Sequence, residues 1–492
     1  MDKDPTAAHE IIFVGTVIND VVQDGISAAH PYGALVAAPL LEAAGVLHVD
    51  PVLRVMPDAP ALGDFRAEFA GMLGLIEERP DDNEGDRTAF EGTVRVIAYD
   101  RLTARTEEGP ADRVDARAFL TARVVDIFLG DWDRHRRQWR WATYDEDDDD
   151  SRSWLPVPTD RDQAFAKFDG LLPSLISIYM PQFVEFKPDY PNIRRLHWNS
   201  RAQDRRFLAG LERSVWDSIA VSVQASLTDD VIEEAVSRLP PEIFAINGQE
   251  LIDALKTRRD DLTSPVEDLY ELIAEDTDIF ATDASELVVV DRNEPGFVTV
   301  SLADSESAAA PYLQRRLMAG ETKEIRICMG GGDDRVLIHG DDDTNIEIRV
   351  VGGPGDDVFE VNDSRDDVTL HDSQGNNIVS GSAARSLDTK EFDQWVWSQN
   401  DRDQPRDWGD ATKPIFWSTY SSDLGFFLGG GFRRERYGFR TEAYSRRIDY
   451  KVGFSILESP FSIRQAVDPY WADDPHHEFW KGRPWTGQDV PW

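Results

Sequence analysis

The chain has 492 residues, of which 41% are hydrophobic, and it contains 14 Trp and 24 Phe. This composition excludes a disordered protein and predicts a globular chain with more than one hydrophobic core. The formal net charge of −40 repels nucleic acid and anionic lipid, so neither is expected as a partner. The single cysteine, Cys328, excludes an intramolecular disulfide and a cysteine-based zinc cluster.

The first part of the chain is predicted to be mainly helical. Residues 10–45 carry apolar side chains at helical spacing, and residues 115–130 read as an amphipathic helix with Asp115 as its N-cap. Two strands around an acidic turn follow, and the chain becomes helical again over about 202–275. These segments predict an α+β domain over residues 1–275, most of it a helical lobe.

The sequence pattern changes near residue 276. From 276 to 382, short alternating strands are separated by turns rich in Gly and Asp, which predicts a β-rich module. A polar linker and three or four strands of the membrane-barrel type occupy residues 383–492. Because the smallest barrels need about eight strands, this last part is expected to be an incomplete barrel.

A candidate catalytic motif follows the helix that ends near residue 130. The stretch GDWDRHRRQWRW places Asp133 five residues before Gln138, and TDRDQAF brings Asp160 and Asp162 back beside it after the two-stranded hairpin. Phosphoryl transfer needs a carboxylate that orients the acceptor hydroxyl, an amide that binds a metal ion, and a second carboxylate that holds Mg²⁺ against the phosphates. Charged turns with only structural roles use the same residue types. The spacing therefore leaves two interpretations, a catalytic site or a charged turn.

These stretches also resemble known families. GDWDRHRRQWRW and the later DRDQAF are similar to motifs of the kinase-like fold of HipA-type and spore-coat CotH-type kinases. Residues 3 to about 380 resemble a module of bacterial envelope proteins, in which a calcineurin-like phosphoesterase domain precedes the module and a BamA-type surface-antigen barrel follows it. The stretches that carry this second resemblance are DKDP, VVQDGISAAHPYGALVAAPLLEAAGVLH, GMLGLIEERP, RLPPEIFAINGQELIDALKTRRDDL and GGPGDDVF.

The resemblance implies a role for each matching residue. Asp133 would be the base that orients the acceptor hydroxyl. Lys3 would pair with the nucleotide phosphates and would itself be oriented by Asp20 or Asp24, while Arg134 and His135 would be structural or would face the phosphates. The residues expected to hold the metal ion are Asp162, Asp160 and Gln138.

Two functions are therefore expected. The first is Mg-ATP-dependent phosphoryl transfer to an unknown acceptor by a kinase-like protein of the cell envelope (periplasm or outer membrane), with a nucleotide and an outer-membrane barrel or envelope protein as partners. The second is a non-catalytic periplasmic interaction or assembly domain of a BamA-like outer-membrane protein. No glycine-rich loop precedes Lys3, and neither a signal-peptide pattern nor a calcineurin-like dimetal motif is encoded. We therefore expect a chain truncated at both ends, either an active kinase or a pseudokinase.

Two turns of the β-rich module match a calcium-binding repeat. GGPGDDVFE fits the pattern G-G-x-G-x-D-x-U-x at every specified place, with Asp357 as the aspartate, and MGGGDDRVL fits except at Met329, with Asp334 as the aspartate. Such repeats bind Ca²⁺ between stacked turns when they recur at a multiple of nine residues. Asp334 and Asp357 are 23 residues apart, which favours plain turns between short strands. An isolated Ca²⁺ site is the alternative.

Overall fold

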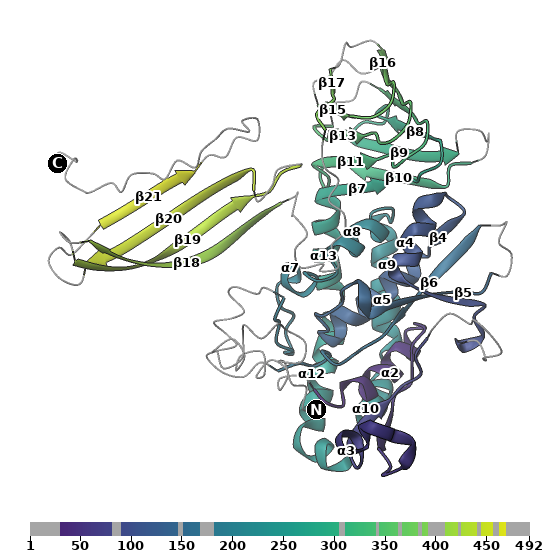
Figure 1. Ribbon diagram of the computed structural model, residues 1–492, viewed down its shortest axis with the longest axis vertical. Coiled ribbons are helices and arrows are strands. Elements are labelled where there is room, and N and C mark those ends of the chain that lie inside the picture. The colour runs from purple at the N-terminus through teal and green to yellow at the C-terminus, as the bar shows by residue number, and fades with distance from the viewer. Residues whose placement is uncertain are drawn as a thin grey trace. The chain divides into compact units, whose positions relative to one another are not determined.

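The protein is described by a computed structural model that divides into two compact units, one ending at Glu391 and one beginning at Phe392. The residues described are 30–80, 90–145, 151–167, 182–304, 310–340, 344–362, 367–381, 386–391, 409–421, 425–439, 444–455 and 462–468. Helices and strands both contribute extensively (Figure 1). The predicted α+β class is therefore confirmed.

The first unit begins with small sheets and the helices around them. β1 (Val52–Val55) pairs antiparallel with β2 (Leu73–Ile76). The main sheet of this region has the strand order β3 (Arg95–Ala98), β5 (Trp139–Thr143), β6 (Arg152–Pro158) and β4 (Asp112–Val114). β5 and β6 are antiparallel, as the sequence predicts. Trp139 and Trp141 are two residues apart in β5 and so lie on the same face of the strand, where both are buried against Phe119.

Helices make up the rest of this lobe, and α5 (Ala116–Leu129) contacts many of the others. It begins where the Asp115 carboxylate accepts a hydrogen bond from the Ala118 N–H at 2.9 Å, and it ends at Gly130, whose φ of 66° suits a residue without a side chain. The other helices are α2 (Gly33–Ala43), α3 (Arg66–Phe69), α4 (Tyr99–Glu108), α7 (Ile193–Leu196), α8 (Arg201–Leu208), α9 (Arg213–Ser226), α10 (Asp229–Ser237), α11 (Pro241–Ile243), α12 (Gln249–Asp260) and α13 (Thr263–Glu275). Short 3-10 or π turns lie at Pro60–Phe65, Phe90–Gly92, Arg136–Gln138 and Phe244–Gly248.

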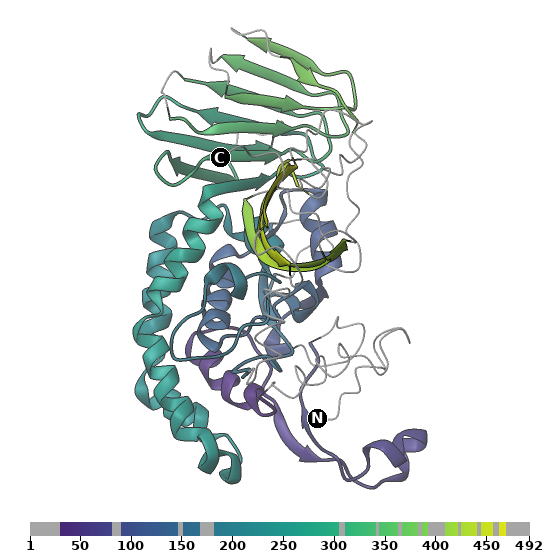
Figure 2. The same ribbon diagram turned by 90° about the vertical axis from the view of Figure 1, so that its left-hand side faces the viewer.

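The β-rich module follows α13 directly and consists of two sheets between which the chain alternates. One sheet contains β17 (Leu387–Asp388), β15 (Val368–His371), β13 (Glu347–Val351), β11 (Glu324–Cys328) and β7 (Asp276–Phe280), all parallel. The other contains β10 (Leu313–Met318), β9 (Phe297–Asp304), β8 (Glu286–Asp291), β12 (Arg335–His339), β14 (Val358–Asn362) and β16 (Ile378–Gly381), parallel from β8 onward. Alternate apolar residues of both sheets form one core. Figure 2 shows the resulting coils stacked one upon another.

The second unit is a four-stranded antiparallel meander. Its strands are β18 (Asp410–Ser421), β19 (Gly425–Arg436), β20 (Arg446–Ser455) and β21 (Ser462–Asp468), paired in chain order. Over its described residues the sheet is open and strongly curved (Figure 2). Within the described parts of the chain, no helix has both the length and the apolar character needed to cross a membrane.

Candidate functional site

The motif residues lie on two adjacent loops. The first loop (residues 130–138) follows α5, and the second loop (residues 159–167) follows β6. The Thr159 N–H donates to the Gln138 carbonyl at 2.9 Å, and the Phe165 N–H donates to the Leu129 carbonyl at 3.2 Å. The antiparallel pairing of β5 with β6 therefore brings together two stretches that are separated by about two dozen residues in the sequence.

Arg134 of the first loop holds the backbone of the second. Its guanidinium donates to the Thr159 carbonyl at 2.9 Å, to the Asp160 carbonyl at 3.4 Å and to the Gln138 carbonyl at 2.9 Å. It also lies over the Trp139 ring, 4.7 Å from the ring centroid. The sequence left two roles open for Arg134, a structural role and a contact with phosphate. Because Arg134 is 0% exposed, this geometry favours the structural role.

Arg161 of the second loop reaches back in the opposite direction. Its guanidinium donates to Asp131 of the first loop at 3.0 Å and to Asp126 of α5. The backbone on either side of Arg161 carries Asp160 and Asp162, the two carboxylates expected to bind metal. The two loops thus exchange arginines, and each loop fixes the position of the other.

This exchange belongs to a larger buried network of charges. It contains three arginines and three aspartates, which are Arg123, Arg134, Arg161, Asp126, Asp131 and Asp204. Burial opposes the ionisation of Asp126, yet the guanidiniums of Arg161, Arg134 and Arg123 outweigh it and lower the pKa of that carboxyl. Burial raises the pKa of Asp131 to about 6, because Arg134 and Arg161 offset only part of the desolvation. Equal numbers of the two charges make so dry a cluster tolerable.

Asp133 remains accessible beside this network. Its side chain is 20% exposed, and one carboxylate oxygen accepts a hydrogen bond of 2.8 Å from the Asn199 side chain. His135 lies nearby, with its Nε2 4.0 Å from the Asp133 carboxylate, and its Nδ1 accepts from the Arg137 N–H. Asn199 precedes α8 and was not expected at the site, because nothing in the stretch LHWNS marks a contact with a loop about 65 residues earlier.

A third acidic residue is influenced by the charges of the second loop. Asp160 is exposed and has a φ of 56°, an uncommon conformation for a residue with a side chain and one that concentrates at functional sites. Asp162 is half-buried. Partial desolvation, followed by the charges of Asp160 and Asp162, raises the pKa of Glu77, which directly follows β2. Glu77 lies in GMLGLIEERP, which resembled the family but carried no predicted site residue.

Gln138 is the last residue of the first loop and is 6% exposed. Its backbone carbonyl accepts hydrogen bonds from Arg134 and from the Thr159 N–H. The other predicted residues lie outside the two loops. Lys3, with its expected partners Asp20 and Asp24, falls outside the described residues. Asp334 and Asp357 lie in the β-rich module, in neighbouring coils. Their spacing of 23 residues is one full coil of this module, so the nine-residue rule does not apply to it.

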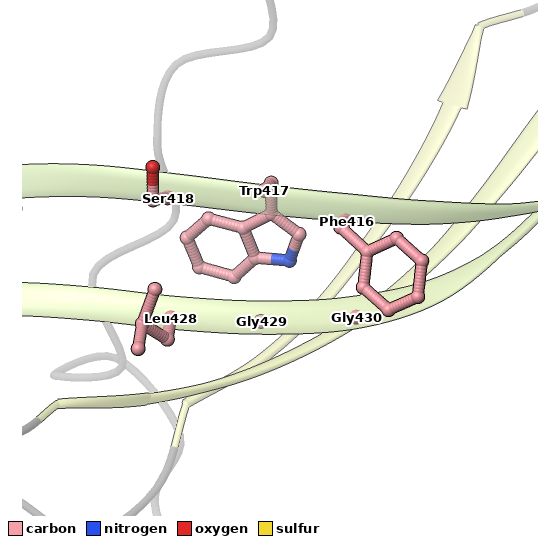
Figure 3. Close-up of a pocket in the computed structure, with 6 residues that line it drawn as sticks. All are labelled: Phe416, Trp417, Ser418, Leu428, Gly429 and Gly430. Atoms are coloured by element: carbon pink, nitrogen blue, oxygen red, sulfur yellow. The ribbon is translucent and has the colours of Figure 1, made fainter. Parts of the chain in front are cut away.

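One cavity lies on the second unit. It has a volume of about 580 Å³ and is lined by Phe416, Trp417, Ser418, Leu428, Gly429 and Gly430 (Figure 3). The Trp417 side chain lies across Gly429, where a Cβ would meet the indole at 2.3 Å. The lining carries no charged side chain, so this cavity offers no group for acid–base or metal chemistry.

Comparisons with solved structures give distant likenesses. No family model and no curated protein sequence matches the chain. A solved structure of the HipA–HipB toxin–antitoxin system of Shewanella oneidensis with its operator DNA is similar at 13% identity and a TM-score of 0.29. The overlap covers 48% of this chain, which spans 57% of the length of that one. At this TM-score the likeness carries no conclusion about the fold or the function of this chain.

Proposed function

We propose that the two loops form a kinase-like site for Mg-ATP-dependent phosphoryl transfer to an acceptor hydroxyl. The observation that carries the proposal is the exchange of Arg134 and Arg161, which fixes the loop of Asp133 against the loop of Asp160 and Asp162. Phosphoryl transfer depends mostly on positioning and electrostatic stabilisation, so a rigid pair of carboxylate-bearing loops is the scaffold it requires.

Each residue of the site has a proposed task. Asp133, held by the Asn199 amide, orients the acceptor hydroxyl and takes its proton. Arg134 and Arg161 act as positioning residues, since both guanidiniums are buried in protein contacts. His135 and Lys3 are proposed to contact the phosphates of the nucleotide.

The carboxylates suit a hard cation. Partial burial, followed by the charges of Asp160 and Asp162, raises the pKa of Glu77, and a cation would lessen the repulsion among these carboxylates. Among the residues that the structure describes, no three His, Cys, Asp or Glu side chains form a ready metal site. Mg²⁺ does not need one, because it is commonly bound by one or two carboxylates together with water and substrate phosphates. A bound Mg²⁺ would neutralise charge on the transferred phosphoryl group.

One observation favours the second candidate, a non-catalytic interaction or assembly domain. Alternate positions of the curved sheet expose large apolar side chains, including Phe416 at 67% and Phe432 at 47%. An exposed apolar face of this kind is typical of a surface that binds another protein or a membrane. For either candidate we propose the cell envelope as the setting, with a nucleotide or an envelope protein as the partner.

The test is calorimetric titration of Mg-ATP into the full chain and its variants. Asp160→Asn and Asp162→Asn remove one negative charge each and keep side-chain size, and Asp268→Asn, an exposed aspartate of α13, is the matched control. We expect binding to the wild type and the control and at least tenfold weaker binding to the two loop variants. Asp133→Asn should retain binding but lose transfer of labelled γ-phosphate. No binding to the folded wild type would contradict the proposal and favour the interaction domain.

A further inference from the structure

The turns that lead from one sheet of the β-rich module to the other are stacked in register. They comprise residues 281–286, 329–334, 352–357 and 372–377. Because β12, β14 and β16 are paired in parallel, the last residues of successive turns form a column. The Asp334 N–H donates to Asp357 Oδ1 at 2.9 Å, and the Asp357 N–H donates to Asn377 Oδ1 at 2.9 Å. One side-chain oxygen in each turn is therefore used to join it to the next.

The other carboxylate oxygen of three aspartates in these turns makes no hydrogen bond between turns. Asp334, Asp357 and Asp372 are 2%, 1% and 2% exposed, and the Oδ2 atom of each is buried without a hydrogen-bond partner. Asp372 opens the last turn, at the place that Gly352 occupies in the turn before it. Its Oδ1 accepts from the Gln374 N–H at 3.0 Å, which leaves Oδ2 for another contact. A buried carboxylate oxygen without a partner costs free energy and calls for an explanation.

Two of these oxygens face the same small space. A Cβ on Gly352 would lie 2.1 Å from Asp372 Oδ2 and 2.7 Å from Asp357 Oδ2. A side chain at this position would displace both carboxylates. The missing side chain leaves room in which the two oxygens converge from neighbouring turns.

Such a pair is unstable when both groups are ionised and bare. Burial, followed by the neighbouring Asp372, raises the pKa of Asp357 to about 7, and burial and neighbouring acids raise the pKa of Asp334 to about 8. Two agents can hold facing carboxylates together, a shared proton or a cation. A shared proton joins the two oxygens in one O–H···O hydrogen bond and neutralises one carboxylate, whereas a divalent cation binds both oxygens and neutralises both charges.

We infer that a Ca²⁺ ion binds between Asp357 and Asp372 beside Gly352, with Asp334 contributing negative charge from the adjacent coil. The ligands offered are oxygens only, which suits a hard cation. Within the described part of the chain, no site combines three His, Cys, Asp or Glu side chains, so backbone oxygens and water complete the shell. Ca²⁺ accepts such a mixed and irregular set of six to eight oxygens, whereas Mg²⁺ requires a near-ideal octahedron. This inference concerns a different part of the chain from the proposed phosphoryl-transfer site and does not depend on it.

The test is the thermal unfolding of the full chain in Ca²⁺, in Mg²⁺ and in a chelator, without nucleotide, together with calorimetric titration of CaCl₂. The variants are Asp357→Asn and Asp372→Asn, which keep an oxygen acceptor in the turn. Asp356→Asn is the matched control, because this carboxylate is in the same turn but exposed, and its Oδ1 accepts from the Asn376 N–H.

We expect Ca²⁺ to raise the melting temperature of the wild type and of Asp356→Asn, with one ion bound per chain. At a concentration of about 100 times the Kd, the unfolding equilibrium constant of the module should fall about 100-fold. Asp357→Asn and Asp372→Asn should melt as a folded protein in chelator and should bind Ca²⁺ at least tenfold more weakly. The absence of any Ca²⁺ effect on the wild type would leave the shared proton as the explanation and overturn the inference. An equal response to Mg²⁺, or an undiminished response of both variants, would overturn it as well.

Discussion

The buried exchange of arginines between the two loops makes Arg161 the residue whose loss should matter most for stability. Arg161→Met keeps the length of the side chain but removes its charge from a site that is 5% exposed. Asp126 retains Arg123 at 2.5 Å and Arg134 at 3.5 Å, whereas Asp131 retains only Arg134 at 3.6 Å. Two arginines then remain for three buried aspartates, which leaves one negative charge unbalanced, so we expect a loss of roughly 3–5 kcal/mol in the free energy of unfolding near pH 8.

The loss should depend on pH because Asp131 can take up a proton. The pKa of Asp131 in the folded chain is about 6, above the ordinary value of 3.8. The contribution of this carboxyl to folding stability is therefore fully present below pH 3.8 and is lost as pH rises through the folded pKa. Removal of Arg161 raises this pKa further. The wild-type contribution of Asp131 should therefore level off near pH 6, whereas in Arg161→Met the decline continues above pH 6, by about 1.4 kcal/mol per pH unit at most.

Urea unfolding followed by tryptophan fluorescence at pH 5 and pH 8 measures both effects, since Trp132 and Trp139 lie next to the network. Arg137→Met, an exposed arginine of the same loop, is the control and should change stability by less than about 0.5 kcal/mol. Adding Asp131→Asn to Arg161→Met restores equal charges and should recover part of the lost stability at pH 8. A cost below about 1 kcal/mol, equal costs at the two pH values, or a further loss in the double variant would refute this account.

Three further predictions concern single contacts. Asn199→Ala removes the hydrogen bond to Asp133 and should lower the rate of phosphoryl transfer about tenfold or more while leaving nucleotide binding unchanged; an unchanged rate would remove Asn199 from the site. Arg258→Met should lower the free energy of unfolding by about 3 kcal/mol in chemical denaturation, because this buried guanidinium donates to the last carbonyls of α5. Its neighbour Arg259, paired with an exposed aspartate, should cost less than about 1 kcal/mol when changed to Met. Gly130→Ala places a Cβ 3.0 Å from the Phe186 ring at a φ of 66° and should cost roughly 1–2 kcal/mol by thermal melting.

Local features were predictable wherever the signal lies within a few residues. Asp115 and Gly130 mark the ends of α5 through a side-chain cap and a left-handed residue, and both act in the structure as the sequence indicates. The hairpin of β5 and β6 follows in the same way from alternation around an acidic turn. Such elements depend on hydrogen bonds and apolar periodicity within one segment of chain, so the segment itself specifies them.

The site was predictable only in part, because its residues act through distant contacts. DRDQAF was interpreted through its two aspartates, yet the arginine between them is the residue that joins the loops. Asn199 contacts Asp133 from another part of the lobe and stands in no motif. Glu77 lies in a stretch whose resemblance marked no site residue, and the charges of Asp160 and Asp162 act on it. Burial also assigned Arg134 to the protein interior, which no spacing rule could distinguish from a phosphate contact.

The sequence by itself determined which residue types can carry chemistry, where the helical lobe gives way to strands, and that Gly352 and Asp357 belong to one tight turn. The tertiary structure alone decided which of these groups meet. The 23-residue spacing of Asp334 and Asp357 conveys nothing until parallel pairing sets the length of a coil, and Asp372 joins them only because Gly352 leaves space beneath it. The physical reason is that hydrogen bonding and periodicity act along the chain, whereas the convergence of buried charges depends on how separate segments pack together.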